Sequence, residues 1–131
     1  MNRRTATLAA ALFAVGVSLT ACAPATDDQI AEQTVNKFAE SVRNLDMDGV
    51  AAVMCEGKTG LKLPDSVVDR GVKAPIDADV VEPAAYDAEK DAWLASVEIP
   101  EFRSGEDDSA HAILEVAVVD GAGCVQSLVM A

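Results

Sequence analysis

The stretch IAEQTVNKFAESVRNLDMDGVAAVMC, residues 30–55, decides the fold of this chain. Apolar side chains recur in its first half at the spacing of one helix face, at Ile30, Val35, Phe38, Val42 and Leu45. Asp27 or Asp28 is expected to cap that helix, and Asp48 to cap a short second helix that ends before Cys55. The stretch therefore predicts a helix, an acidic turn and a second helix.

Strand patterns follow a less regular segment. Residues 56–79 carry scattered glycines and prolines, which predict a loop with one helical turn at residues 66–70. Alternating and short apolar runs predict strands at residues 80–81, 93–99, 112–119 and 124–130. Hairpin connections are expected at residues 102–108 and 120–123, and Asp120-Gly121 is typical of a tight turn.

This order of elements predicts an α+β fold. An amphipathic N-terminal helix and a short helix are expected to pack on a curved antiparallel sheet. Phe38 and Val42 should lie under the sheet face that carries Leu114, Val116 and Val118.

A family resemblance rests on two runs of residues, Val35-x-x-Phe38-x-x-Ser41-Val42 and Leu45-Asp46-x-Asp48-x-Val50-x-x-Val53-Met54-Cys55. They resemble the opening of NTF2-like (cystatin-like α+β) domains, particularly the small actinobacterial lipoproteins of that type. The resemblance implies an NTF2-like roll over residues 28–131, in which the sheet wraps the long helix. The long segment after Cys55 and the weak strand at residues 80–81 depart from the family pattern. Because NTF2-like folds include isomerases, hydratases and pure binding domains, the resemblance does not choose an activity.

The amino terminus has the pattern of an export signal. Arg3 and Arg4 precede an apolar run at residues 9–19, and small residues lead to Cys22. Leu19-Thr20-Ala21-Cys22 resembles the lipobox of bacterial lipoproteins, which implies lipid on Cys22 and a place on the extracytoplasmic side of the cell membrane. We therefore expect a lipoprotein signal peptide at residues 1–21, a tether at 22–27 and a single α+β domain at 28–131.

Other interpretations of the amino terminus fit less well. A bilayer-spanning helix needs about 20 apolar residues, and the run within residues 5–21 is shorter and interrupted by Ser18 and Thr20. A twin-arginine signal has aromatic or leucine residues after the pair, whereas this chain has Thr5-Ala6-Thr7. The general secretory route is therefore favoured.

Acidic side chains outnumber basic ones. The chain has 22 Asp and Glu against 10 Lys and Arg, and loss of Arg3 and Arg4 with the signal leaves 22 against 8, or −14. Such a surface repels nucleic acid and anionic lipid headgroups. We therefore expect no nucleic-acid partner and contact with the membrane through the lipid on Cys22.

Two cysteines remain once Cys22 carries lipid, Cys55 and Cys124. An exported chain meets an oxidising compartment, so a disulfide between them is expected. It would close a loop over 69 positions and contribute roughly 4 kcal/mol in the chain-entropy account. Metal binding or a redox pair are the rivals, but His111 is the only histidine and no Cys-x-x-Cys spacing occurs.

Candidate acids or bases for an NTF2-like enzyme are His111, Tyr86, Asp46 and Asp48. Each has a simpler structural role. His111 begins a strand beside an acidic run, the two aspartates suit turns and caps, and Tyr86 lies in a polar connection. No Gly-x-Ser-x-Gly motif occurs. We therefore assign no catalytic residue and expect no cofactor.

An acidic run copies the spacing of a calcium loop. Asp87-x-Glu89-x-Asp91, with Glu98 at the twelfth place, matches the ligand positions of an EF-hand. Ala92 stands where that loop needs glycine, and the residues after it have a strand pattern. A solvated hairpin turn is therefore expected in place of a metal site.

The sequence thus favours a lipid-anchored domain of the cell envelope that binds an unknown envelope protein or a small ligand without catalysis. A carrier of small apolar ligands and an NTF2-like isomerase or dehydratase are the alternatives. After loss of the signal the chain keeps four aromatic residues, which disfavours a large aromatic-lined pocket. Binding of a partner protein is therefore expected first.

Overall fold

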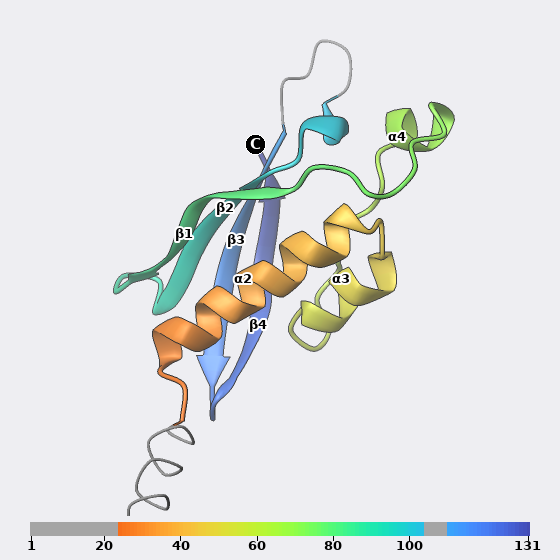
Figure 1. Cartoon of the computed structure of the whole chain (residues 1–131). Helices are drawn as coiled ribbons and strands as arrows, with labels where there is room; N and C mark the ends of the chain where they lie inside the picture. The colour runs from red at the N-terminus through yellow and green to blue at the C-terminus, as the bar shows by residue number, and fades with distance from the viewer. Residues whose placement is uncertain (1–23, 104–109) are drawn as a thin grey trace, which may run out of the picture.

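A four-stranded antiparallel sheet with strand order β1-β2-β3-β4 forms one layer of the molecule, and the long helix α2 lies across one face of it (Figure 1). The structure is a computed structural model that describes residues 24–103 and 110–131. Its helices are α2 (Asp27–Arg43), α3 (Met47–Val53), α4 (Asp65–Asp69) and the 3-10 helix η1 (Pro100–Phe102). Its strands are β1 (Asp79–Asp87), β2 (Ala92–Glu98), β3 (His111–Val119) and β4 (Ala122–Met130).

This order confirms the predicted α+β class with an antiparallel meander after the helices. The sheet runs from edge strand β1 to edge strand β4 and does not close. The NTF2-like roll in particular stays a prediction.

The N-cap of helix α2 lies one residue before the first of the two predicted caps, Asp27. The N-cap is Thr26, whose hydroxyl accepts a hydrogen bond from the Gln29 backbone N–H at 3.2 Å. The Gln29 side chain accepts one in return from the Thr26 N–H at 2.9 Å, which completes a capping box. Asp27 and Asp28 lie instead in the first turn, where their charges complement the helix dipole.

Helix α3 also begins earlier than predicted. Asp46 is its N-cap and accepts a hydrogen bond from the Gly49 N–H at 2.9 Å, while Asp48 lies in the first turn. Leu45 makes the reversal between the two helices with a φ of 53°. The predicted helix, acidic turn and helix are confirmed, and only the capping residues differ.

Strand β1 is longer than the predicted two residues. It spans Asp79–Asp87 and includes Pro83, because β1 is an edge strand and a proline there interrupts no ladder on its free side. Its pairing with β2 shifts register twice, between Val80 and Glu82 and between Glu82 and Ala85. Tyr86 therefore lies in a strand, opposite Trp93, and the prediction that placed it in a connection is wrong.

The connection between β3 and β4 confirms the predicted tight turn. Asp120 and Gly121 have φ values of 52° and 77°, as a two-residue turn between right-twisted strands requires. Gly123 follows at the start of β4, where a side chain would collide with the Thr34 hydroxyl of α2. The glycine therefore lets β4 approach the helix closely.

The core lies between α2 and the facing side of the sheet. Phe38 and Val42 are fully buried there with Leu114 and Val116, as predicted, and Val118 at the end of β3 is partly buried. Phe102 also belongs to this core at 4 % exposure, although its position predicted a hairpin connection. Helix η1 turns the chain so that this ring points inward. Residues 104–108 of the predicted connection lie outside the described residues.

The disulfide between Cys55 and Cys124 is present and joins the end of the helical region to the last strand. The Cys55 N–H donates to the Val125 carbonyl at 2.8 Å, and Met54 forms a parallel bridge to Val125. Hydrogen bonds and a covalent link thus fix this segment along the outer edge of β4.

Replacing Phe38 tests the packing of the helix on the sheet. Phe38→Ala should lower the free energy of unfolding by about 3–5 kcal/mol. The Phe38 ring is fully buried, so its removal loses apolar contacts and leaves a cavity in the core. Val68→Ala is the control, since Val68 is 59 % exposed on α4 and should change stability little. Urea unfolding followed by circular dichroism measures both, and equal midpoints would contradict this architecture.

Candidate functional site

The side of the sheet opposite α2 has no described helix over it. Along β2, Trp93, Ala95 and Val97 belong to the core, so the side chains between them point to the opposite face. In β3 and β4 the facing pair Ile113 and Val129 is 38 % and 56 % exposed. Figure 1 shows the helices on one side of the sheet only. We call the uncovered side, which carries Ile113 and Val129, the outer face.

A shallow groove of about 370 Å³ lies on the outer face beside Ile113. Its floor includes Leu94 and Ser96 of β2, and its wall is formed by β1 with Glu82 and Pro83. Ser96 and Ile113 are directly paired across β2 and β3, so the groove continues onto the exposed pair Ile113 and Val129. The outer face thus carries the apolar side chains Leu94, Ile113 and Val129 beside the ion pair of Lys90 and Glu115.

The aromatic pair Tyr86 and Trp93 lies where β1 and β2 approach their shared turn. The ring centroids are 4.9 Å apart with planes at 61°, an edge-to-face contact. The Trp93 indole N–H donates to Asp28 Oδ1 of α2 at 2.7 Å, and the Tyr86 hydroxyl donates to Asp91 Oδ1. Trp93 is 8 % exposed and Tyr86 50 % exposed, so the tyrosine ring is the accessible member.

The carboxylates around Tyr86 change its acidity. The hydrogen bond to Asp91, then burial, and then the negative charges of Asp91 and Asp87 raise the pKa of Tyr86 above its usual 10.0. All these causes favour the neutral phenol, because a phenolate beside carboxylates is repelled. Tyr86 is therefore a hydrogen-bond donor at neutral pH and has no tendency to act as a base.

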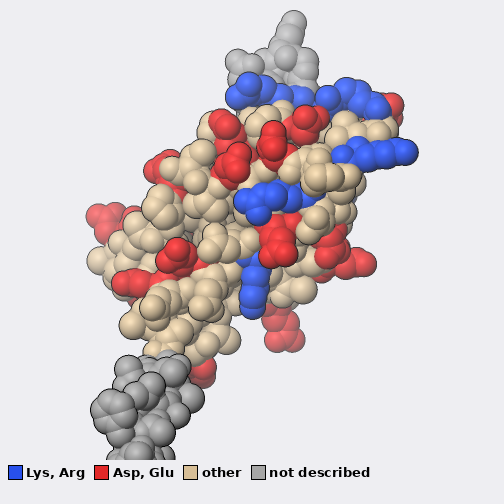
Figure 2. All heavy atoms as spheres, viewed as in Figure 1, with Lys and Arg blue, Asp and Glu red and all other residues tan. Residues whose placement is uncertain are grey.

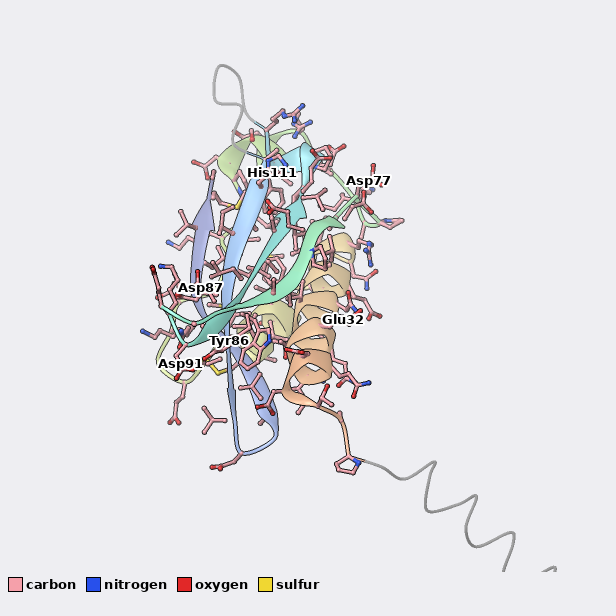
Figure 3. All side chains as sticks on the ribbon, turned by 90° about the vertical axis from the view of Figure 1, so that its left-hand side faces the viewer. Glu32, Asp77, Tyr86, Asp87, Asp91 and His111 are labelled. Carbon is pink, nitrogen blue, oxygen red and sulfur yellow. A yellow bond between two sulfur atoms is a disulfide. The ribbon has the colours of Figure 1, made fainter. Side chains whose placement is uncertain are left out.

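The sequence-derived acid–base candidates do not converge. Tyr86 lies at one end of the sheet and His111 at the other, as Figure 3 shows. His111 Nε2 pairs with Glu98 Oε2 at 3.5 Å across β2 and β3. Asp46 and Asp48 belong to the start of α3 and serve its first turn. The described residues therefore place these four side chains in three separate locations.

The calcium-like spacing becomes a hairpin turn. Asp87 closes β1 and its Oδ1 accepts from the N–H groups of Glu89 and Lys90, while Asp91 turns the chain with a φ of 50°. Glu98 lies at the far end of β2, about 20 Å along the strand from Ala92. The four carboxylates cannot share one ion, and within residues 24–103 and 110–131 no group of three potential ligands is placed to hold a metal.

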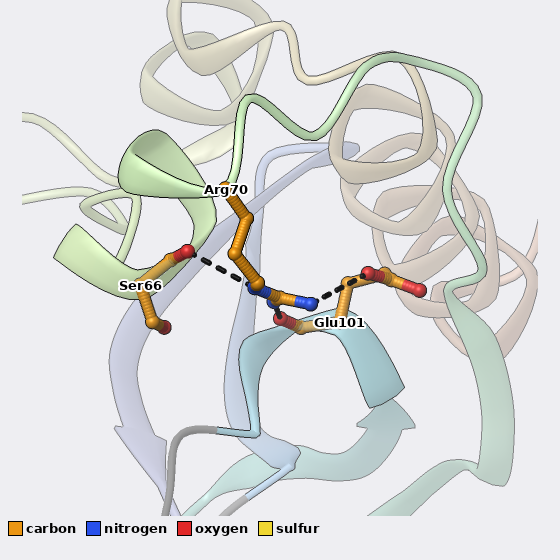
Figure 4. Close-up of polar contacts among 3 residues, drawn as sticks. All are labelled: Ser66, Arg70 and Glu101. Carbon is orange, nitrogen blue, oxygen red and sulfur yellow. Dashed lines mark hydrogen bonds and ion pairs between the residues drawn. The ribbon is translucent and has the colours of Figure 1, made fainter.

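The ion pairs of the described residues are surface contacts. Arg70 of α4 donates from Nε to the Ser66 carbonyl at 3.0 Å and from Nη2 to the Glu101 carbonyl at 2.8 Å, with Glu101 Oε2 3.6 Å from Nη1 (Figure 4). These contacts join α4 to η1. Figure 2 shows acidic side chains spread over the α2 side of the molecule, whereas several basic ones gather toward the end that carries α4.

The predicted lipidation residue Cys22 and the export signal lie outside the described residues. Residues 24–26 precede α2 without regular secondary structure, and the tether at residues 22–27 stays a prediction. No helix in the described part of the chain is long and apolar enough to cross a bilayer. Cys55 and Cys124 are consumed by their disulfide and offer no thiolate for metal or redox chemistry.

Comparison of the chain with protein-family models, with curated proteins and with solved structures gives no match.

Sequence reasoning missed the aromatic pair. Trp93 was predicted to begin a strand, and Tyr86 was predicted to lie in a connection. The signal was available in the spacing, since an acidic turn at residues 88–91 between two aromatic residues places their rings on one face of a hairpin. Recognition of that turn required β1 to be predicted at its full length.

The acidity of Tyr86 is open to direct measurement, because Tyr86 is the only tyrosine of the chain. Asp91→Asn should bring its pKa down toward 10.0, since a neutral amide accepts the phenol hydrogen bond more weakly than a carboxylate and does not repel the phenolate. Titration of tyrosinate absorbance measures it. Because the raised pKa belongs to the folded state, the contribution of Tyr86 to stability is present below pH 10 and is lost as the pH rises through that pKa. An unchanged titration curve in Asp91→Asn would contradict the explanation that Asp91 raises the pKa of Tyr86.

Proposed function

We propose that this chain is a lipid-anchored extracytoplasmic domain of the cell envelope that binds a partner protein and catalyses no reaction. The observation that supports it most directly is the outer face, where the paired Ile113 and Val129 are exposed on a sheet whose opposite side carries the core. An apolar strip on a rigid sheet is what a docking surface requires.

The packing between α2 and the sheet argues for binding over catalysis. Phe38, Val42 and Leu114 fill that space with no exposed surface. The buried polar side chains of the described residues are Thr34 and Ser96, neither of which ionises, and Thr34 donates to the Ile30 carbonyl at 2.8 Å. An enzyme of the isomerase or dehydratase kind needs an acid or base inside the fold. An apolar carrier needs an enclosed cup, and the groove beside Ile113 is a surface feature.

The proposed anchor is consistent with the start of the fold. Cys22 would be separated from the first residue of α2, Asp27, by four residues, and the capping box at Thr26 fixes where the chain becomes rigid. A linker of that length holds the domain close to the bilayer. The net acidic surface keeps the domain itself from adhering to anionic headgroups.

Removal of the proposed lipid site should release the protein. Cys22→Ser should move the chain from the membrane fraction to the soluble fraction and abolish its labelling by a radioactive fatty acid, because no second anchor is proposed. Cell fractionation and autoradiography measure these changes. A variant that remains in the membrane fraction, beside a wild-type chain that takes up no lipid, would refute the lipoprotein assignment.

A photo-crosslinking amino acid on the outer face should identify the docking surface. Placed at Val129, it should give one discrete adduct in intact cells, whereas the same residue at Val68 should give none. The two positions are matched in exposure at 56 % and 59 %, but Val68 lies on α4.

The adduct must also depend on the surface around the probe. Ile113→Asp, next to the crosslinking residue at position 129, should lower the yield of the adduct. The midpoint of thermal unfolding should stay near that of the wild type, since Ile113 is outside the core. Equal adducts from positions 129 and 68, or none from position 129, would contradict a partner on the outer face.

A further inference from the structure

A second hollow, of about 680 Å³, lies beside the aromatic pair at the end of the sheet where α2 begins. The rings of Tyr86 and Trp93 line it together with Asp27, Asp28 and Asp91. Val118 and Val119 complete an apolar wall. Its charged lining residues are all carboxylates. The hollow therefore combines aromatic surface with negative charge.

The geometry of the aromatic pair leaves one ring available. The indole of Trp93 is fixed by its hydrogen bond to Asp28 and packs edge-to-face with Tyr86. Tyr86 is held in turn by its bond to Asp91, and half of its surface is exposed. A cation over an aromatic face is attracted by the negative π-cloud, and a nearby carboxylate adds to that attraction. Both partners are held in place here before any ligand arrives.

Tyr86 lines both the groove and the hollow, which lie on opposite faces of the sheet and are separated by the edge strand β1. The groove presents Leu94 and Ile113, and the hollow presents aromatic rings with carboxylates. An extended segment that crosses the edge strand β1 at Tyr86 would meet an apolar site on the outer face and a cation site on the α2 side. This sequence of surfaces specifies the chemistry of the partner.

We propose that the Tyr86–Trp93 hollow receives an arginine or lysine side chain of the partner protein, while a neighbouring apolar side chain of the same segment lies in the groove beside Ile113. This inference rests on the proposed function and names the partner chemistry: a basic and apolar segment. Arginine is the better fit, because its planar guanidinium stacks on an aromatic ring and pairs with a carboxylate at once. The strongly acidic chain would also accelerate encounter with such a segment.

The test uses the full chain in nonionic detergent and two synthetic peptides, acetyl-Leu-Arg-Leu-Arg-amide and the same peptide with glutamine in place of arginine. Trp93 is the only tryptophan, so its single indole N–H signal in a nitrogen–proton correlation spectrum reports on the hollow. The arginine peptide should shift this signal in a saturable and salt-sensitive manner, and the glutamine peptide should bind at least several-fold more weakly.

Three variants separate the ring from the charge. Tyr86→Leu should lower the affinity for the arginine peptide by about 2- to 30-fold, which corresponds to the energy range of a cation–π contact. Tyr86→Phe keeps the ring and should bind the peptide with the affinity of the wild type. Asp91→Asn should weaken it to a similar extent. Asp69→Asn, which removes one exposed charge on α4, should leave affinity unchanged.

Equal binding of the two peptides, or equal affinity in Tyr86→Leu and the wild type, would overturn the cation site. That failure is distinct from failure of the proposed function, since the adduct from Val129 would still form. Loss of that adduct with peptide binding intact would instead overturn partner docking on the outer face and leave the cation site standing.

Discussion

The packing of the α2 stripe on the inner face of the sheet is the constraint on which the rest of the structure depends. Phe38 and Val42 from the helix meet Leu114 and Val116 from β3 with no exposed surface. Burying such side chains is the main favourable term available to a small domain, and a sheet needs one covered face to be stable in water. Once that face is used, the sheet's other side is free to serve another purpose.

Two cross-links hold this arrangement at opposite ends of α2. At its start, Asp28 receives the Trp93 indole N–H, so the first turn of the helix is bound to β2. Beyond its end, the disulfide and the Val125 hydrogen bond attach the segment after α3 to β4. The aromatic hollow and the apolar groove thus sit on a platform whose strands are fixed relative to the helix. A preorganised platform reduces the entropy that a bound segment must overcome.

Much of the fold could be predicted from the sequence because its signals are local. The helical spacing of Val35, Phe38 and Val42 and the alternation in β2 and β3 are one-dimensional patterns, and the structure confirms them. The capping box at Thr26 was missed because two aspartates immediately after it are equally good capping residues on their own. Strand β1 was predicted only at residues 80–81 because Pro83 and two register shifts break its alternation, and these are features that an edge strand accommodates. The contact between Tyr86 and Trp93 was not predicted either, because it depends on the pairing of β1 with β2, which is a tertiary contact.

The irregularity of β1 has a further consequence under the proposed membrane anchoring. An unpaired strand edge is a template for another chain, and anchored molecules meet at high local concentration. In β1 the proline and the register shifts interrupt the row of free backbone groups, and at the opposite edge Met54 and Cys55 already occupy the middle of β4. Both lateral edges therefore resist strand addition from neighbouring copies. Neighbouring copies would therefore not join edge to edge, and another chain would contact the sheet through its side chains.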